Sequence, residues 1–181
     1  MYRIPLVIQK GLLFILTVLL LTFILVGTLH AQSPRAAEKL YHPEANAAKD
    51  IREAVAEAAR THKNVFIQLG GNWCTWCLAF HRFVKEDTAL SRVLQENYVI
   101  YHLNYSPENK NVALLEKYQY PQRFGFPCFL ILNQTGALLH TQNSAYLEKG
   151  KGYDRQKVLT FFQNWTVAAL SRSTYQQQLG K

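Results

Sequence analysis

The sequence predicts an α/β fold in which helices pack on a central sheet. Segments with helical periodicity alternate with short apolar runs rich in β-branched and aromatic residues. The last two apolar runs flank a hairpin turn, and a final helix follows them. No internal repeat or second domain is visible, and 49% hydrophobic residues in a chain of 181 are enough for one core. We therefore expect a single layered α/β domain.

The helices are predicted from apolar residues that recur every three or four positions. In the first of them, Ile51, Val55 and Ala58 share one face. Asp87 or Thr88 is expected to cap the third helix, and Asp154 the last one, since their side chains accept hydrogen bonds from the first turn. The predicted helices cover residues 44–61, 74–86, 88–95 and 111–118, and a segment that begins after Asp154.

The strands are predicted from short apolar runs that end at turn residues. The run from Val65 to Leu69 is apolar enough to lie in the centre of a sheet. The segment from Asn133 to Gly136 has the composition of a hairpin turn between the last two strands. The four predicted strands cover residues 65–69, 98–103, 128–132 and 137–141.

The N-terminus has the order of a secretory signal. Arg3 and Lys10 precede an almost unbroken apolar run from Gly11 to Leu29, and Ala31 is the expected last residue before cleavage. The apolar run is also long enough to span a bilayer, so residues 1–31 are either a signal peptide or an N-terminal membrane anchor. Both alternatives place the rest of the chain outside the cytoplasm, in the periplasm or another extracytoplasmic space.

The remaining chain divides into three parts. Residues 32–43 are expected to form a linker, because prolines stand near both of its ends. Residues 44–170 contain all the predicted helices and strands and form the expected domain. Residues 171–181 are left as a C-terminal tail.

The net charge of +8 falls to +6 when Arg3 and Lys10 are removed with the N-terminal segment. The basic residues are scattered, and no aromatic–basic repeat is present. This distribution is typical of a basic surface and argues against nucleic acid as a partner.

Two of the three cysteines, Cys74 and Cys77, are separated by two residues. A loop this short adds little stability through chain entropy, and three cysteines are too few for a disulfide scaffold. Cys74 is expected at a helix N-terminus, where unpaired N–H groups and the helix dipole favour a thiolate. The pair is therefore predicted to carry redox chemistry.

The segment Trp73-Cys74-Thr75-Trp76-Cys77 follows a predicted buried strand, and Gly125-Phe126-Pro127 precedes a later one. With these motifs the chain resembles the thioredoxin superfamily over about residues 49–165. Residues 73–87 and 111–118 are most similar to periplasmic thiol:disulfide interchange proteins such as the C-terminal domain of DsbD. The resemblance implies a thioredoxin-like three-layer α/β/α sandwich with a central mixed sheet.

The resemblance also implies an activity, that of a thiol:disulfide oxidoreductase. Cys74 matches the exposed nucleophile and Cys77 the shielded resolving thiol that releases the mixed disulfide. The expected partners are protein disulfides or dithiols and a membrane or soluble thiol electron donor. No cofactor is expected besides the Cys74–Cys77 disulfide, and the direction, reductase or oxidase, stays open.

Four further residues are implied to contact the substrate. Pro127 matches the cis-proline that faces the cysteine pair, and the backbone of Phe126 would pair with the bound substrate. Trp73 matches the aromatic wall beside the nucleophile, and Trp76 lies between the two cysteines.

The sequence departs from the family beneath the cysteine pair. Gln68 stands where many thioredoxins have a buried acid, and an amide cannot accept the proton of Cys77. His102 stands where the family often has a lysine in the neighbouring strand. It is either the proton acceptor or an ordinary strand histidine. His81, four residues after Cys77, is expected on the solvated face of its helix.

Two alternative classes are a metal-binding module and a non-catalytic binding module. The metal site would use Cys74, Cys77 and one of three residues: His81, His102 or Cys128. No second Cys-x-x-Cys is present to close a structural zinc site, so no metal ligand is assigned. Covalent haem is disfavoured because Leu78 follows Cys77. Cys128 is expected to be a buried, inert thiol.

Overall fold

Pro5 and residues 39–179 are the part of the chain that the computed structural model describes. The predicted signal peptide or anchor over residues 1–31 lies outside this part, apart from Pro5. Among the described residues, no helix has the length and apolar character needed to cross a bilayer.

A mixed four-stranded sheet forms the centre of the domain. Its strands are β1 (Asn64–Gly70), β2 (Tyr98–Asn104), β3 (Cys128–Leu132) and β4 (Leu138–Asn143). The spatial order is β2-β1-β3-β4, with β1 parallel to β2 and the other two pairs antiparallel. Every residue of β1 and β3 is buried, as expected of central strands covered on both faces.

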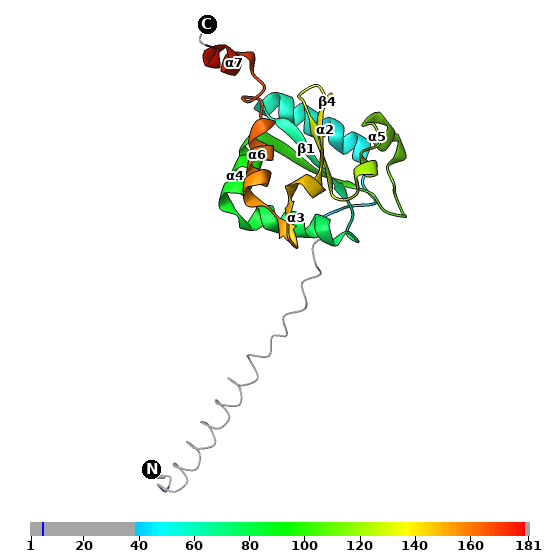
Figure 1. Ribbon diagram of the computed structural model, residues 1–181. Coiled ribbons are helices and arrows are strands. Elements are labelled where there is room, and N and C mark those ends of the chain that lie inside the picture. The colour runs from blue at the N-terminus through cyan, green and yellow to red at the C-terminus, as the bar shows by residue number, and fades with distance from the viewer. Residues whose placement is uncertain (1–4, 6–38, 180–181) are drawn as a thin grey trace, which may run out of the picture. The chain divides into compact units, whose positions relative to one another are not determined.

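Helices cover both faces of this sheet (Figure 1). The helices α2 and α5 pack on one face, whereas α3, α4 and α6 pack on the other. The three-layer α/β/α sandwich with a central mixed sheet is thus confirmed. The helices span Ala47–Thr61 (α2), Thr75–Glu86 (α3), Thr88–Asn97 (α4), Val112–Lys117 (α5), Arg155–Asn164 (α6) and Arg172–Gln178 (α7).

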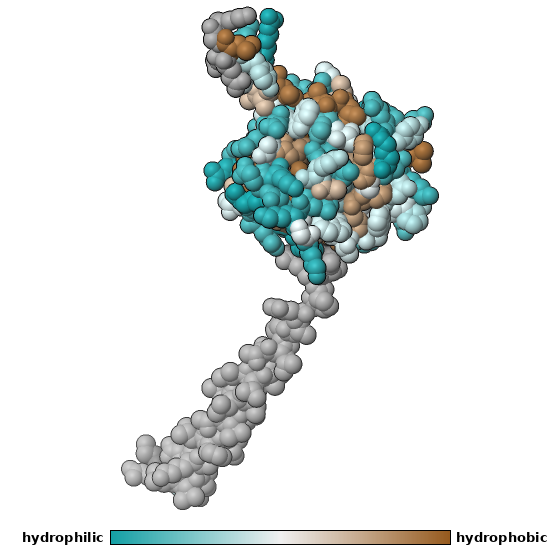
Figure 2. Space-filling view, in the orientation of Figure 1, coloured by the Kyte–Doolittle hydropathy of each residue, from teal (hydrophilic) through white to brown (hydrophobic). Residues whose placement is uncertain are grey.

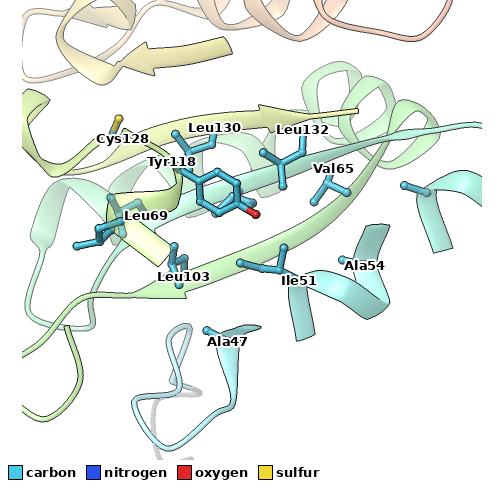
Figure 3. Close-up of a cluster of buried hydrophobic side chains, with 13 residues drawn as sticks. Ala47, Ile51, Ala54, Val65, Leu69, Leu103, Tyr118, Cys128, Leu130 and Leu132 are labelled. Carbon is cyan, nitrogen blue, oxygen red and sulfur yellow. The ribbon is translucent and has the colours of Figure 1, made fainter. Parts of the chain in front are cut away.

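Side chains along the strands point alternately to opposite faces of the sheet and form two separate cores. The first core joins α2 and α5 to the sheet through aliphatic side chains such as Ile51, Leu69 and Leu130 (Figure 3). The second core is aromatic, and its centre is Phe66, whose ring lies within 6.5 Å of five other aromatic rings. Burial of these rings removes a large apolar area from water and supplies much of the driving force for folding.

The helix starts follow the predicted chemistry. The Asp87 carboxylate accepts hydrogen bonds from the backbone of Ala89 and Leu90, and Asp154 caps α6 in the same way.

The sequence did not reveal two short 3₁₀ helices, a hairpin of two-residue strands and α7. These are η1 (Pro121–Phe124), η2 (Ser144–Leu147), β5 (Glu148–Lys149), β6 (Gly152–Tyr153) and α7, which lies in the predicted tail. Elements this short carry too few residues to show a periodicity.

The face of the molecule in Figure 2 is mostly hydrophilic, with hydrophobic residues in small groups. The described segment before α2 is not fully exposed to solvent, because Tyr41 within it is completely buried. Tyr41 belongs to the stretch that was expected to be a linker, and its side chain packs against the two cysteines.

Candidate active site

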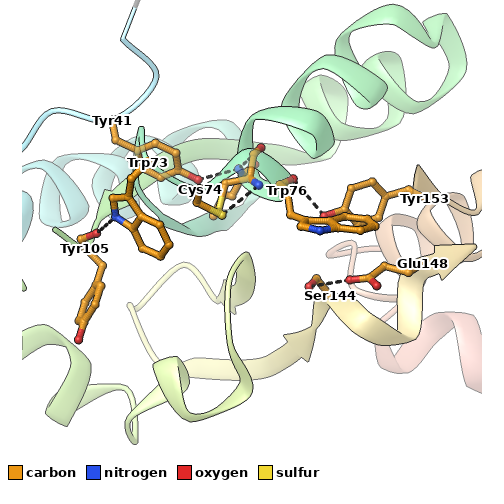
Figure 4. The surroundings of a disulfide bond; sticks show 10 residues. Tyr41, Trp73, Cys74, Trp76, Tyr105, Ser144, Glu148 and Tyr153 are labelled. Carbon is orange, nitrogen blue, oxygen red and sulfur yellow. Dashed lines mark hydrogen bonds between the residues drawn. A yellow bond between two sulfur atoms is a disulfide. The ribbon is translucent and has the colours of Figure 1, made fainter. Parts of the chain in front are cut away.

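The cysteine pair lies where β1 turns into α3 (Figure 4). Cys74 and Cys77 form a disulfide, and their Cα atoms are 5.2 Å apart. Cys74 is the N-cap residue of α3, and its sulfur accepts a hydrogen bond from the backbone N–H of Cys77 at 3.1 Å. This N–H, at the positive end of the helix dipole, stabilises negative charge on Cys74 once the disulfide is reduced.

The two cysteines differ in access to solvent. Cys74 is 5% exposed and Cys77 is completely buried. Cys74 is therefore the outer thiol, as expected, although it is far less exposed than the nucleophile that the resemblance implied.

Three aromatic side chains form a wall beside Cys74. The Trp73 indole is 54% exposed and donates a hydrogen bond to the backbone carbonyl of Tyr105 at 2.7 Å. The Phe126 ring meets Trp73 edge-on at 5.3 Å and stacks on Tyr105 at 4.9 Å. A Cβ on Gly71 would collide with the Trp73 indole nitrogen, so glycine at this position permits the indole to fold back.

The peptide bond between Phe126 and Pro127 is cis. It directly precedes β3, which pairs with β1, the strand leading to the cysteines. Phe126 packs against the cluster of Tyr41, Cys74 and Cys77. The structure thus brings Phe126 to the cysteine pair, and Pro127 is its buried neighbour in the chain.

Trp76 lies on the other side of the disulfide and is partly buried. The Tyr153 hydroxyl donates a hydrogen bond to the Trp76 carbonyl at 3.1 Å, and the two rings meet edge-on at 5.5 Å. The β5–β6 hairpin, which carries Tyr153, therefore supports the first turn of α3.

Gln68 lies beneath the disulfide, at the position where a carboxylate was expected from the family. Its side-chain amide donates to the Cys77 carbonyl at 2.9 Å and to the Tyr41 hydroxyl at 2.7 Å. Both Gln68 and Tyr41 are buried, so the polar pair is shielded from water. Burial raises the pKa of the Tyr41 hydroxyl, which stays protonated at neutral pH.

Asn72 holds the segment that carries Tyr41. The Tyr41 N–H donates to the Asn72 side-chain oxygen at 3.1 Å, and the Asn72 amide donates to the Tyr41 carbonyl at 2.7 Å. This reciprocal pair joins the segment before α2 to the loop that precedes Cys74.

His102 is the register partner of Gln68 on β2 and lies on the same face of the sheet. Its ring meets the Tyr41 ring edge-on at 5.7 Å and the His81 ring at 5.4 Å. Burial, followed by repulsion from His81 and His42, lowers the pKa of His102 to about 4. His102 is thus neutral at pH 7 but a weak base. His81 is half-buried against it, which corrects the expectation of a solvated surface residue.

Cys128 is a free, fully buried thiol in the core on the α2 face. Burial raises its pKa to about 12, so it stays protonated at neutral pH.

The described residues contain no group of three or more histidine, cysteine or acidic side chains that could hold a metal ion.

A cavity of about 600 Å³ lies next to the Trp73 wall. Its lining includes Trp73, Tyr105 and Pro107, and the buried side-chain oxygen of Asn104, another lining residue, has no hydrogen-bond partner among the described residues. The cavity offers apolar surface and the unpaired acceptor of Asn104 next to Trp73.

Sequence reasoning missed Tyr41. Its position in a short segment between prolines shows no helical or strand periodicity. The adjacent apolar residues Leu40 and Tyr41, between polar neighbours, are the only signal of burial there. The contact of Tyr41 with Gln68 joins positions 27 apart in the sequence and depends on tertiary packing.

Comparison with known proteins agrees with this architecture. Residues 46–134 match a family model described as thioredoxin-like. A disulphide isomerase from Xylella fastidiosa Temecula1 has 23% identity and a TM-score of 0.63, over 71% of this chain and 98% of that chain. None of the curated proteins compared with the sequence matches it.

Two other solved structures are similar at a lower level. A thioredoxin from Thermus thermophilus has 22% identity and a TM-score of 0.49, over 66% of this chain and 85% of its own. The oxidised C-terminal domain of DsbD from Neisseria meningitidis has 15% identity and a TM-score of 0.47, over 65% and 95%. The family match over residues 46–134 and the fold shared with the Xylella protein agree with the resemblance of the sequence to the thioredoxin superfamily.

Proposed function

We propose that this protein is an exported thiol:disulfide oxidoreductase that reduces or exchanges disulfides in protein substrates. The observation that carries the proposal is the Cys74–Cys77 disulfide at the N-terminus of α3, with one sulfur at the surface edge and the other fully buried. This asymmetry suits an attacking thiol and a resolving thiol better than a structural crosslink.

In the reducing direction, the Cys74 thiolate attacks one sulfur of the substrate disulfide. A bond forms between Cys74 and that sulfur, and the other substrate sulfur leaves as a thiolate that takes up a proton. The Cys77 thiolate then attacks the Cys74 sulfur, and the second substrate sulfur leaves. Two electrons have passed to the substrate, the Cys74–Cys77 disulfide has formed, and a dithiol donor must reduce it again.

The aromatic wall and the cis-proline loop are the proposed substrate contacts. Trp73 and Phe126 present apolar surface next to Cys74, and Trp76 borders its other side. Aromatic side chains bind extended polypeptides with little side-chain ordering, so they suit varied protein substrates.

Substitution of each cysteine tests the assignment of roles. Cys74→Ser should reduce insulin-disulfide reduction to the background rate, because the attacking sulfur is lost. Cys77→Ser should accumulate a mixed disulfide through Cys74, because the resolving sulfur is lost. Mass spectrometry of the trapped adduct identifies the linked cysteine.

Cys128→Ser serves as the control, since Cys128 lies in the opposite core. A trapped adduct on Cys77 in the Cys74→Ser protein, with none on Cys74 in the Cys77→Ser protein, would reverse the two roles. If the wild-type protein reduced no disulfide at any donor potential, the proposed function would be rejected.

Export is proposed from the N-terminal residues, whose charged and apolar order is that of a signal or anchor. Expression of the whole chain in a bacterium, followed by fractionation and N-terminal sequencing, tests it. Mature protein that begins after Ala31 indicates a cleaved signal, and uncleaved protein in the membrane fraction indicates an anchor. Full-length protein in the cytoplasm would contradict export.

A further inference from the structure

The orientation of the Gln68 amide determines what the Tyr41 hydroxyl can do. The Gln68 nitrogen faces the Cys77 carbonyl at 2.9 Å, and a carbonyl only accepts, so this end of the amide must be its NH₂ group. The same nitrogen lies 2.7 Å from the Tyr41 oxygen and donates to it. The hydrogen of the Tyr41 hydroxyl is therefore left to be donated elsewhere.

The buried sulfur of the pair is a candidate acceptor. A Cβ on Gly70 would collide with the Cys77 sulfur and would lie 2.8 Å from the Tyr41 oxygen. Both atoms thus border the same small space, which the absence of a side chain on Gly70 leaves open. Tyr41, Cys74 and Cys77 form one buried cluster, and Figure 4 shows the Tyr41 ring pointing toward the disulfide. Among the described residues, no group accepts a hydrogen bond from the Tyr41 hydroxyl while the disulfide is formed.

The hydroxyl is also held in place. The reciprocal hydrogen bonds with Asn72 attach the Tyr41 backbone to the active-site loop, and the side chain is completely buried. A buried donor without an acceptor costs free energy, whereas a hydrogen bond to a charged acceptor is among the stronger ones in proteins.

We infer that Tyr41 is the group that stabilises the Cys77 thiolate when the disulfide is reduced, by donating its hydroxyl hydrogen to that sulfur. A sulfur in a disulfide is a weak acceptor, but a thiolate is a strong one, so the interaction favours the reduced state. It also favours the ionised form that attacks Cys74 in the resolving step. Tyr41 and Gln68 together thereby occupy the place of the buried acid, with thiolate stabilisation instead of proton acceptance.

This inference deepens the proposed function and rests on it for the resolving step. Its test needs no protein substrate, because it measures the cysteine pair alone. The titratable groups around Tyr41 are His102 on β2 and Tyr153 on β6, and His81 and His42 act in turn on His102. The histidines must be retained in all variants so that their titration is common to every comparison.

The experiment compares Tyr41→Phe with the wild-type protein. Equilibration of the whole chain with glutathione mixtures gives the equilibrium constant of the Cys74–Cys77 disulfide. Loss of the donor should shift this constant about tenfold toward the disulfide, which lowers the reduction potential by about 30 mV. In the Cys74→Ser background, ultraviolet titration of the Cys77 thiolate should give a pKa about one unit higher in Tyr41→Phe than in the protein that retains Tyr41.

Tyr118→Phe is the matched control. Tyr118 is also buried and its hydroxyl has no partner among the described residues, but it lies in the core on the α2 face. Its loss should leave both measurements unchanged. Should Tyr41→Phe fail to fold, site-specific 3-fluorotyrosine at position 41 retains the shape and gives a more acidic donor, which should lower the Cys77 pKa.

An unchanged potential and an unchanged Cys77 pKa in Tyr41→Phe would overturn the inference. A Cys77 pKa that does not respond to fluorotyrosine would overturn it as well. A wild-type protein with the expected Tyr41 effect but no activity on any disulfide substrate would instead reject the proposed function and leave the hydrogen bond standing.

Discussion

At the scale of single residues, three polar groups lie around the buried sulfur of the cysteine pair. Gln68 supplies hydrogen-bond donors where an acid is expected, Tyr41 faces the buried sulfur, and His102 packs against the Tyr41 ring. None of these groups carries a charge at neutral pH, because burial keeps Tyr41 protonated and His102 deprotonated. The site therefore has no strong base for the proton of Cys77.

The lowered pKa of His102 predicts a pH-dependent stability. Its pKa is about 4 in the folded state and about 6.5 in an unfolded chain, so the unfolded state binds more protons between these values. Stability should be unaffected by this group above pH 7 and should fall by at most about 3 kcal/mol as the pH drops to 4. Urea unfolding of oxidised protein at a series of pH values measures this loss.

His102→Gln should remove this part of the pH dependence, whereas His62→Asn, at an exposed helix end, should retain it. A profile identical in both variants would show that His102 is not responsible. If His102 accepts the proton of Cys77, His102→Ala should slow disulfide exchange by about tenfold to a hundredfold, at or below the low end of general-base effects. The low pKa of His102 favours the smaller loss.

At the scale of elements, the central sheet separates the redox-active pair from the third cysteine. All of β3 is buried, and Cys128 contributes to the core on the α2 face. Gln68 and Phe66 on the neighbouring β1 face the opposite side, where α3 lies. The alternation of side chains along the strands thus places Cys128 and the cysteine pair in different environments.

Cys128 should therefore remain a reduced and unreactive thiol. With a pKa of about 12 and no exposed surface, it should not react with iodoacetamide at pH 7 in the folded, oxidised protein. Complete labelling should follow in denaturant without a reducing agent. Mass mapping gives the labelled position, and a Cys128 linkage to either Cys74 or Cys77 in the resting protein would contradict this prediction.

At the scale of the whole molecule, two cores of different chemistry share one sheet. The core toward α2 is built mainly of aliphatic residues, whereas the core toward α3, α4 and α6 is a network of aromatic rings around Phe66. The start of α4 is further tied to α6 by a hydrogen-bonded ion pair between Arg155 and Asp87. The ion pair lowers the pKa of the Asp87 carboxyl. Its contribution to the stability of the folded state is therefore present above the usual carboxylate pKa and is lost in acid.

Phe66→Ala should destabilise the protein severely. Removal of a large, fully buried ring leaves a cavity at the centre of the aromatic network, and such substitutions cost about 3–5 kcal/mol. This is a large part of the stability of a typical domain. Guanidinium unfolding of the oxidised protein measures the change.

Tyr146→Ala provides the comparison, since Tyr146 is largely exposed and its loss should change the stability by less than about 0.5 kcal/mol. Equal stability losses in the two variants would contradict the central position assigned to Phe66.

The sequence was sufficient for the parts of the fold that depend on local periodicity. The strand before Gly70 and the helix after Cys74 follow from apolar spacing, and the cap at Asp87 follows from its side-chain chemistry. Tyr41 and the pairing of His102 with His81 depend on contacts between distant segments, which no local pattern encodes. The half-burial of His81 was missed for that reason, since its helical position alone pointed to solvent.

The reciprocal hydrogen bonds between Tyr41 and Asn72 bear on how the protein can be shortened for laboratory work. A fragment that begins at Glu44 would retain every strand and helix of the sandwich and both cysteines. It would nevertheless lack the side chain that fills the space under the disulfide, and water would enter there. Such a fragment should fold and give the spectrum of a folded protein. Its redox potential should nevertheless differ from that of the protein that retains Tyr41. The N-terminal boundary of an expressed domain should therefore lie before Lys39.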